Sequence, residues 1–155
     1  MKTVIFDLDG TLALIDKRRA ISTKDNGKID WDTFFDPKNI DLDLPHQAVI
    51  DMAKVLKDSG HMIVIFSGRS KATKDATKNW LDKFGVPFDV LKMRPTGKGF
   101  KFMADDHLKK KWFNDLFPTQ DHIDDVVCVF DDRQKVVDMW RDMGLTCMQV
   151  APGNF

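Results

Sequence analysis

The chain has 155 residues, 43% of them hydrophobic, and a formal net charge of zero. This length is typical of a single domain whose core is large enough to fold without stabilising disulfides. The neutral balance excludes attraction to polyanions through net charge alone. No apolar run is long enough for a membrane span, and the N-terminus does not resemble a secretory leader. We therefore expect a cytoplasmic protein without a membrane partner.

Strand-like and helix-like segments alternate along the chain. Apolar, β-rich runs occupy residues 3–6, 62–66, 86–91, 126–130 and 145–150. Apolar residues recur with helical period in segments 48–56, 72–84, 108–117 and 136–143, and Gly or Pro follows each of them. This alternation predicts an α/β fold, a three-layer α/β/α sandwich around a parallel, Rossmann-like sheet. Residues 1–155 would form one domain.

Residues 13–44 fit neither the strand nor the helix pattern. The segment follows the first strand and carries many charges together with Trp31, Phe34 and Phe35. We interpret it as a small cap insertion. Its aromatic side chains could pack the cap onto the core, or they could stack on a nucleobase.

Polar side chains follow three of the predicted strands. Asp7 and Asp9 come after the first strand, the Ser67-Gly68-Arg69 stretch after the second, and Asp131 with Asp132 after the fourth. In open parallel sheets, ligands bind beyond the carboxyl ends of the strands. The sequence therefore predicts that carboxylates, a hydroxyl and a guanidinium meet at one edge of the sheet.

This set of groups suits phosphoryl transfer. Asp7 and Asp9 lie two residues apart, so in extended backbone their side chains point the same way. Gly10 permits an abrupt turn and Thr11 could hydrogen-bond to its neighbours. One carboxylate could attack phosphorus and the other act as general acid and base. Oxygen ligands favour Mg²⁺, and Ser67 with a guanidinium and a lysine would bind the phosphoryl oxygens.

Structural roles remain open for several of these residues. Asp132 could cap the helix that follows the fourth strand, and Ser67 could cap the helix after the second. Arg69 could be a surface residue. Arg94 follows the third strand at the edge of the predicted site. It could face the substrate, or it could be an edge residue that does not contact it.

Charge is distributed unevenly along the sequence. Residues 67–111 contain 12 Lys and Arg against 5 Asp, whereas residues 112–155 contain 3 against 8. This asymmetry indicates either that one face meets negative charge or that the helices simply have a solvated basic surface.

The motifs resemble a known superfamily. FDLDGT, SGR, a lysine near a helix start and FDD, in this order, are similar to the haloacid dehalogenase (HAD) superfamily of Mg²⁺-dependent phosphotransferases. A narrower resemblance, through DLDGTLA, SGRS, KMRP and the stretch from DDRQKVV to the C-terminus, is to the 3′-phosphatase domain of bacteriophage polynucleotide kinase–phosphatase. It covers nearly the whole chain except residues 13–44.

The resemblance implies roles for the acidic residues. Asp7 would be the nucleophile and Asp9 the general acid and base. The Mg²⁺ ligands would be the Asp7 side chain, the Asp9 backbone carbonyl and Asp131. Asp132 would help to hold the metal site through water or orient its neighbours.

It also implies roles for basic residues. Arg18 matches a substrate-binding arginine in its spacing from Asp7, although a solvated surface role is an alternative. Lys109 aligns best with the active-site lysine, and Lys110 and Lys111 are close competitors. The remaining residues expected to bind substrate or phosphate are Thr11, Ser67, Gly68, Arg69 and Arg94.

These expectations converge on a Mg²⁺-dependent phosphomonoesterase that removes 3′-phosphates from nucleic-acid ends through an aspartyl-phosphate. The insertion is longer than we expect for the phage domain. Because larger caps favour small substrates, a nucleotidase or another small-molecule phosphatase is the first alternative, and a non-catalytic binding module is the second. The expected partners are a phosphorylated nucleic-acid end or a nucleotide, together with a separate kinase or ligase.

Overall fold

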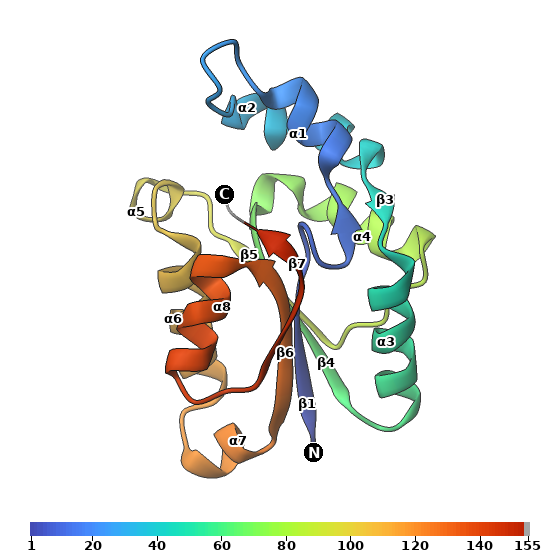
Figure 1. The fold of residues 1–155 in the computed structure, drawn as a ribbon, viewed down its shortest axis with the longest axis vertical. Helices are drawn as coiled ribbons and strands as arrows, with labels where there is room; N and C mark the ends of the chain where they lie inside the picture. Colours follow the sequence, from blue (N-terminus) through green and yellow to red (C-terminus); the bar gives the residue numbers. More distant parts are fainter. Residues whose placement is uncertain (154–155) are drawn as a thin grey trace.

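The computed structural model describes residues 1–153, and it confirms the predicted α/β/α architecture (Figure 1). A five-stranded sheet has the order β5-β4-β1-β6-β7, and all neighbouring strands are parallel. Its strands are β1 (Thr3–Asp7), β4 (Met62–Ser70), β5 (Val90–Arg94), β6 (Val126–Arg133) and β7 (Cys147–Gly153). The central strand β1 is therefore covered on both edges and both faces.

Helices lie on both faces of this sheet (Figure 1). One layer contains α3 (Gln47–Asp58) and α4 (Lys74–Lys83), which follows the short 3₁₀ helix η2 (Lys71–Thr73). The other contains α5 (Lys98–Lys101), α6 (Asp105–Leu116), α7 (Gln120–Asp124) and α8 (Gln134–Asp142). None of the helices within residues 1–153 combines the length and the apolar character that crossing a membrane requires.

Alternation along the strands divides the core in two. In β1, Val4 and Phe6 belong to the hydrophobic cluster on the α3–α4 side, whereas Ile5 belongs to the cluster on the α6–α8 side. Successive strand residues point to opposite faces, so a continuous apolar run supplies both clusters. Trp80 of α4 fills the first cluster, and Trp140 of α8 fills the second.

The insertion lies above the carboxyl ends of the strands (Figure 1). It contains α1 (Asp16–Ser22), α2 (Trp31–Phe34) and the 3₁₀ helix η1 (Pro37–Leu42). Strands β2 (Ala13–Leu14) and β3 (Leu44–Pro45) pair antiparallel where the chain leaves and rejoins the main body.

Aromatic packing holds the insertion together. Phe34 is buried, and its ring contacts Trp31, Phe35 and the guanidinium of Arg18, which lies 4.3 Å from the ring centroid. Trp31 stacks on Phe35 but stays 54% exposed. Trp80 Nε1 donates to the Asp43 carbonyl at 3.0 Å and ties the insertion to α4. Packing therefore accounts for Phe34, while Trp31 keeps an open ring face.

The strand boundaries differ from the expected ones, and β7 runs over Cys147–Gly153 instead of 145–150. The third strand runs over Val90–Arg94 instead of 86–91, because Pro87 has no amide hydrogen to donate to a ladder. Asp89 marks the transition, since its carboxylate accepts from the Ile63 amide at 2.8 Å. Strands β4 and β6 continue beyond the apolar runs, to Ser70 and Arg133.

Candidate active site

Three buried carboxylates meet where β1 and β6 end. Asp7, Asp131 and Asp132 each offer an oxygen atom, and these oxygens lie within 4.8 Å of one another. Asp7 is the last residue of β1, and Phe6 pairs with Phe130, so the parallel register carries Asp131 alongside it. The exposed fractions of the three residues are 7%, 1% and 3%.

Lys109 is the cation that the fold places among them. Its Nζ lies 2.7 Å from Asp7 Oδ1 and 3.1 Å from Asp131 Oδ2, and the residue is 3% exposed. Lys110 and Lys111 are exposed, and Lys111 pairs with Asp115 on the same helix. Of the three candidate lysines, only Lys109 makes these contacts within residues 1–153.

The cluster carries more negative charge than Lys109 neutralises. Burial and then the nearby Asp131 carboxylate raise the pKa of Asp7 well above its ordinary value. Burial likewise raises the pKa of Asp132. Burial lowers the pKa of Lys109, but the carboxylates of Asp131 and Asp7 outweigh it and raise that pKa. Three buried carboxylates around one ammonium form an oxygen-donor set that fits a hard divalent cation.

The turn after β1 orients Asp7. Gly10 has a φ of +85°, and a Cβ there would overlap the Asp132 carboxylate, so only glycine fits this turn. Thr11 is fully buried, and its hydroxyl lies 3.0 Å from Asp7 Oδ2 and 3.3 Å from Asp132 Oδ1. The Thr11 hydroxyl therefore contacts the acidic cluster, and the Thr11 amide donates to the Leu8 carbonyl at 3.1 Å.

A second cluster lies beside the first. The carboxylate of Asp9 is held by two fully buried guanidinium groups: Oδ1 accepts from Arg18 Nη2 at 2.8 Å and from Arg69 Nε at 2.8 Å. Burial raises the pKa of Asp9, but Arg69 and Arg18 together outweigh it and lower the pKa to about 2. Asp9 is thus ionised in this state.

Asp43 completes the second cluster and was not predicted. Its carboxylate accepts from Arg18 Nε at 3.0 Å, Arg18 Nη2 at 2.9 Å and Arg69 Nη2 at 2.8 Å. Burial raises the pKa of Asp43 to about 6, against the influence of the two arginines. Asp43 lies at the end of the insertion and does not follow any strand of the central sheet, so no motif pointed to it.

The last residues of β4 include Ser67 and Gly68. Ser67 is buried, and its hydroxyl accepts from the Arg69 amide at 3.1 Å. The cap of the following 3₁₀ helix is Ser70, whose hydroxyl accepts from the Ala72 amide, so capping does not explain Ser67. A Cβ on Gly68 would lie 2.6 Å from Asp105 Oδ1, so any other residue there would have to push the Asp105 carboxylate aside.

Arg94 belongs to a third group of charges. Its guanidinium donates to the backbone carbonyls of Gly68, Phe100 and Met103 and pairs with Asp105. Asp105 also accepts from Arg133 Nη1 at 2.6 Å. Arg94 makes no direct contact with the carboxylate cluster within residues 1–153. Sequence reasoning did not single out Asp105 or Arg133, because Arg94, Asp105 and Arg133 meet only through the tertiary arrangement of β5, α6 and β6.

The fold and this arrangement of acids and bases define a phosphatase of the HAD type. A family model described as "Polynucleotide kinase PNKP phosphatase domain" matches residues 1–155. The chain therefore belongs to this family of phosphatase domains, and it is a phosphoric monoester hydrolase. The sequence-based resemblance is confirmed at this level.

Two relatives are more than 30% identical to this chain. A protein of Autographa californica nuclear polyhedrosis virus, described as "Putative bifunctional polynucleotide kinase/RNA ligase", is 34% identical over 148 residues, which cover 92% of this chain and 18% of the viral protein. A structure of the Pnkp1/Rnl/Hen1 RNA repair complex contains a chain with 33% identity and a TM-score of 0.77; the match covers 99% of this chain and 43% of that one. This chain thus spans less than half of either relative.

More distant structures share the fold alone. One is described as a predicted phosphatase from Clostridium acetobutylicum, with 15% identity and a TM-score of 0.70 over 96% of this chain and 83% of its own.

Proposed function

We propose that the protein removes the 3′-phosphate from nucleic-acid ends through an aspartyl-phosphate intermediate. The observation that carries this proposal is the Asp7 carboxylate. It is buried, oriented by the Thr11 hydroxyl, and held 2.7 Å from the Lys109 ammonium. A carboxylate fixed in this way is arranged to attack an electrophile rather than to be solvated.

The reaction has two steps in this account. An Asp7 oxygen forms a bond to phosphorus while the bond from phosphorus to the 3′-oxygen breaks, and Asp9 gives its proton to the leaving oxygen. Asp9 then takes a proton from water, which attacks the aspartyl-phosphate, releases inorganic phosphate and restores the Asp7 carboxylate. The same residue serves as acid and then as base.

Asp9 must be protonated to act as an acid, yet in this state Arg69 and Arg18 hold its pKa at about 2. A phosphate dianion is a strong acceptor for guanidinium groups and competes with Asp9 for them. Binding of the substrate would therefore weaken the grip of Arg18 and Arg69 on Asp9 and raise its pKa. Ser67 and the backbone of Gly68 add donors for the phosphoryl oxygens.

We propose Mg²⁺ as the cofactor. Asp7, Asp131 and the backbone carbonyl of Asp9 would hold it, with Asp132 positioned to bind its water. When bound, the ion neutralises negative charge on the cluster and on the phosphate group. The excess of buried carboxylates over the single Lys109 ammonium supports this assignment.

Lys109 should be required for catalysis, whereas its neighbour Lys110 should not. We expect Lys109→Met to lower kcat by about a hundredfold or more, because removal of one preorganised donor to a developing charge has an effect of that size. Lys110→Met, at an exposed position on the same helix, should leave kcat within about twofold of wild type. Phosphate release is measured on both variants after circular dichroism has established that they are folded. Equal activity of the two variants would contradict the role of Lys109.

A phosphorylated nucleic-acid end is the proposed substrate. The family description and the kinase, ligase and repair-complex names of the relatives support it. A kinase and a ligase, on separate chains or on the same longer protein, are the proposed partners, because a ligatable end requires a 3′-hydroxyl and a 5′-phosphate. The insertion would act as a cap over the site, and the open ring face of Trp31 is available to a base.

A competition panel tests the substrate class. Wild-type protein is given equal concentrations of an oligonucleotide with a 3′-phosphate, the same oligonucleotide with a 5′-phosphate, and nucleoside monophosphates. We expect the highest kcat/KM for the 3′-phosphorylated oligonucleotide. A preference for mononucleotides would contradict the end-repair assignment and favour a nucleotidase.

A further inference from the structure

A groove lined by lysines lies at the β5 edge of the sheet. It has a volume of about 410 Å³, and four lysines line it, namely Lys71, Lys74, Lys92 and Lys111. Strand β5 is an edge strand, so this side of the sheet has no further strand covering it. Lys92 lies within β5, Lys71 and Lys74 lie at the start of the α4 layer, and Lys111 lies on α6.

Most of this positive charge is not compensated locally. Lys111 pairs with Asp115, the one acidic residue that lines the groove. Lys71, Lys74 and Lys92 have no acidic partner within residues 1–153. In contrast, the exposed Lys57 and Lys2 at the other end of the sheet pair with Asp89 and Asp125. The groove thus gathers in one place three lysines without an acidic partner among the described residues.

The groove is continuous with the elements that carry the candidate active site. Lys71 follows Arg69 by two residues. Met93 and Pro95, which also line the groove, flank Arg94, whose side chain donates to the Gly68 carbonyl at 3.0 Å. The residues that would receive the phosphate therefore lie next to residues that line the groove, at the carboxyl ends of β4 and β5.

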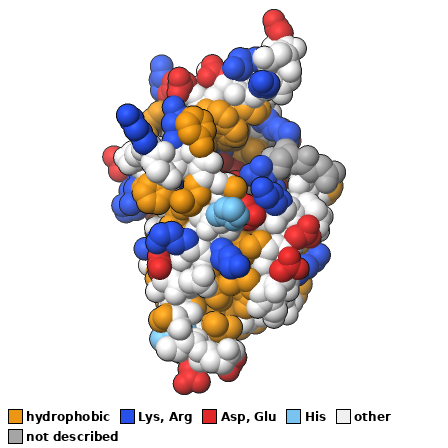
Figure 2. All heavy atoms as spheres, turned by 90° about the vertical axis from the view of Figure 1, so that its left-hand side faces the viewer, with side chains coloured by type: hydrophobic (Ala, Val, Ile, Leu, Met, Phe, Trp, Pro, Cys, Tyr) orange, Lys and Arg blue, Asp and Glu red, His pale blue; other side chains and the backbone are white. Residues whose placement is uncertain are grey.

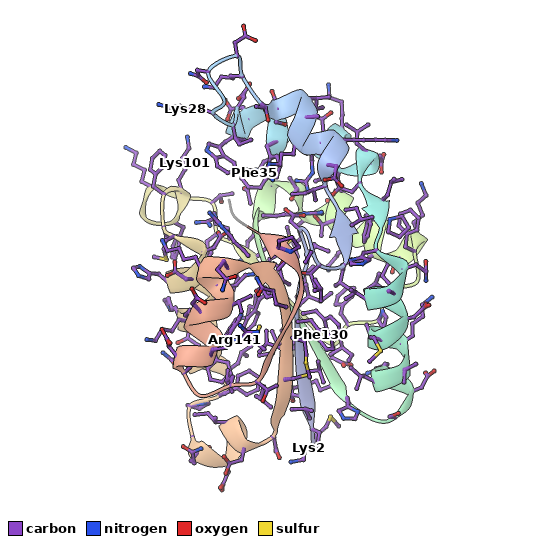
Figure 3. All side chains as sticks on the ribbon, viewed as in Figure 1. Lys2, Lys28, Phe35, Lys101, Phe130 and Arg141 are labelled. Carbon is purple, nitrogen blue, oxygen red and sulfur yellow. The ribbon has the colours of Figure 1, made fainter. Side chains whose placement is uncertain are left out.

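The lining combines cations with apolar side chains. Phe100 and Trp112 contribute rings to it, next to the lysines. Figure 2 looks onto the side of the molecule that carries α5 and α6, and Lys and Arg side chains surround exposed hydrophobic ones along one margin of this face. In Figure 3, Lys101 of α5 and Lys28 and Phe35 of the insertion lie toward the end of the molecule that carries the insertion, far from Lys2. Single-stranded nucleic acid binds surfaces of this kind, which offer cations to phosphates and apolar groups to bases.

We propose that this groove binds the strand upstream of the terminal 3′-phosphate. The inference rests on the proposed function and extends it, because it assigns a path to the part of the substrate that does not react. At the opposite edge of the sheet, the hollow beside β7 is lined, among residues 1–153, by Gln134, Gln149 and apolar residues, without a lysine or arginine. The excess of Lys and Arg in residues 67–111 therefore predicts the path of the nucleic-acid strand, which would leave the active site over β5.

The test compares two triple variants on a long and a short substrate. Lys71→Ala/Lys74→Ala/Lys92→Ala removes the unpaired groove charges. Lys2→Ala/Lys57→Ala/Lys83→Ala removes the same net charge at exposed positions that do not line the groove. Each protein is assayed, across a range of salt concentrations, with a single-stranded 3′-phosphorylated oligonucleotide and with a nucleoside 3′-monophosphate. Thermal unfolding establishes that both variants are folded.

We expect the groove variant to lose about tenfold or more in kcat/KM for the oligonucleotide and to keep wild-type activity on the mononucleotide. Three fewer phosphate contacts should reduce the slope of log kcat/KM against log salt by about two. The control variant should match wild type on both substrates. If the groove variant keeps the preference for the oligonucleotide, strand binding in the groove is contradicted, whereas the proposed substrate class stands. A wild-type protein that does not prefer the oligonucleotide would overturn the proposed substrate class and the groove together.

Discussion

Asp7→Asn should abolish phosphate release while the protein stays folded. The amide keeps the size of the carboxylate but is not a nucleophile toward phosphorus, so we expect kcat to fall by more than about a thousandfold, or about 4 kcal/mol in the barrier. The change also removes one of three crowded carboxylates, at a position where burial and then repulsion from Asp131 raise the pKa of Asp7. The folded state should therefore tolerate it.

The matched control is Asp58→Asn, at an exposed position at the end of α3. Phosphate release from a 3′-phosphorylated oligonucleotide and from an aryl phosphate is measured for both variants, together with thermal unfolding. We expect Asp58→Asn to behave as wild type. Hydrolysis by Asp7→Asn at more than a few per cent of the wild-type rate would mean that another group attacks phosphorus.

Asp9→Asn should separate the two chemical steps. With a nucleic-acid substrate, loss of the general acid should lower kcat by about a hundredfold or more. An aryl phosphate has a leaving group that needs no proton, so its first step should survive. The second step still lacks the base that activates water. We therefore expect a burst of the aryl alcohol, close to one equivalent per enzyme, followed by slow turnover.

Asp9→Asn should not weaken substrate binding, although it lowers kcat. Asp9 and Asp43 together balance the charges of Arg18 and Arg69, so Asp9→Asn leaves one guanidinium charge uncompensated. KM should stay the same or decrease, because an anion then meets less competition for these arginines. A raised KM with an unchanged kcat would show that Asp9 only positions the arginines and takes no part in proton transfer.

The acidic cluster followed from the sequence because it depends on local rules. Asp7 and Asp131 each come directly after an apolar run of a strand, and parallel strands bring their carboxyl ends to the same edge. Lys109 also had a local signal: it precedes the buried Trp112 and Phe113 by three and four residues, which places it on the inner face of α6. Lys110 and Lys111 are rotated out of that face.

The residues that were missed depend on tertiary contacts. Asp43 meets Arg18 and Arg69 only because η1 packs against α4 and Trp80 holds the Asp43 carbonyl. Asp105 lies where α6 begins, and its position above Gly68 depends on how the turn after β5 folds. Neither carboxylate follows a strand of the predicted sheet, and an acidic residue at the start of a helix or in a short connection has no periodicity to mark it.

The central claim is that the Asp7 carboxyl oxygen, and not water, makes the first new bond to phosphorus. The most direct measurement is the stereochemical course at phosphorus, followed with an oligonucleotide whose 3′-thiophosphate is chiral through oxygen isotopes and hydrolysed in isotopically labelled water. Two successive in-line displacements predict overall retention of configuration in the released thiophosphate. Inversion would require a single displacement by water and would contradict the aspartyl-phosphate account.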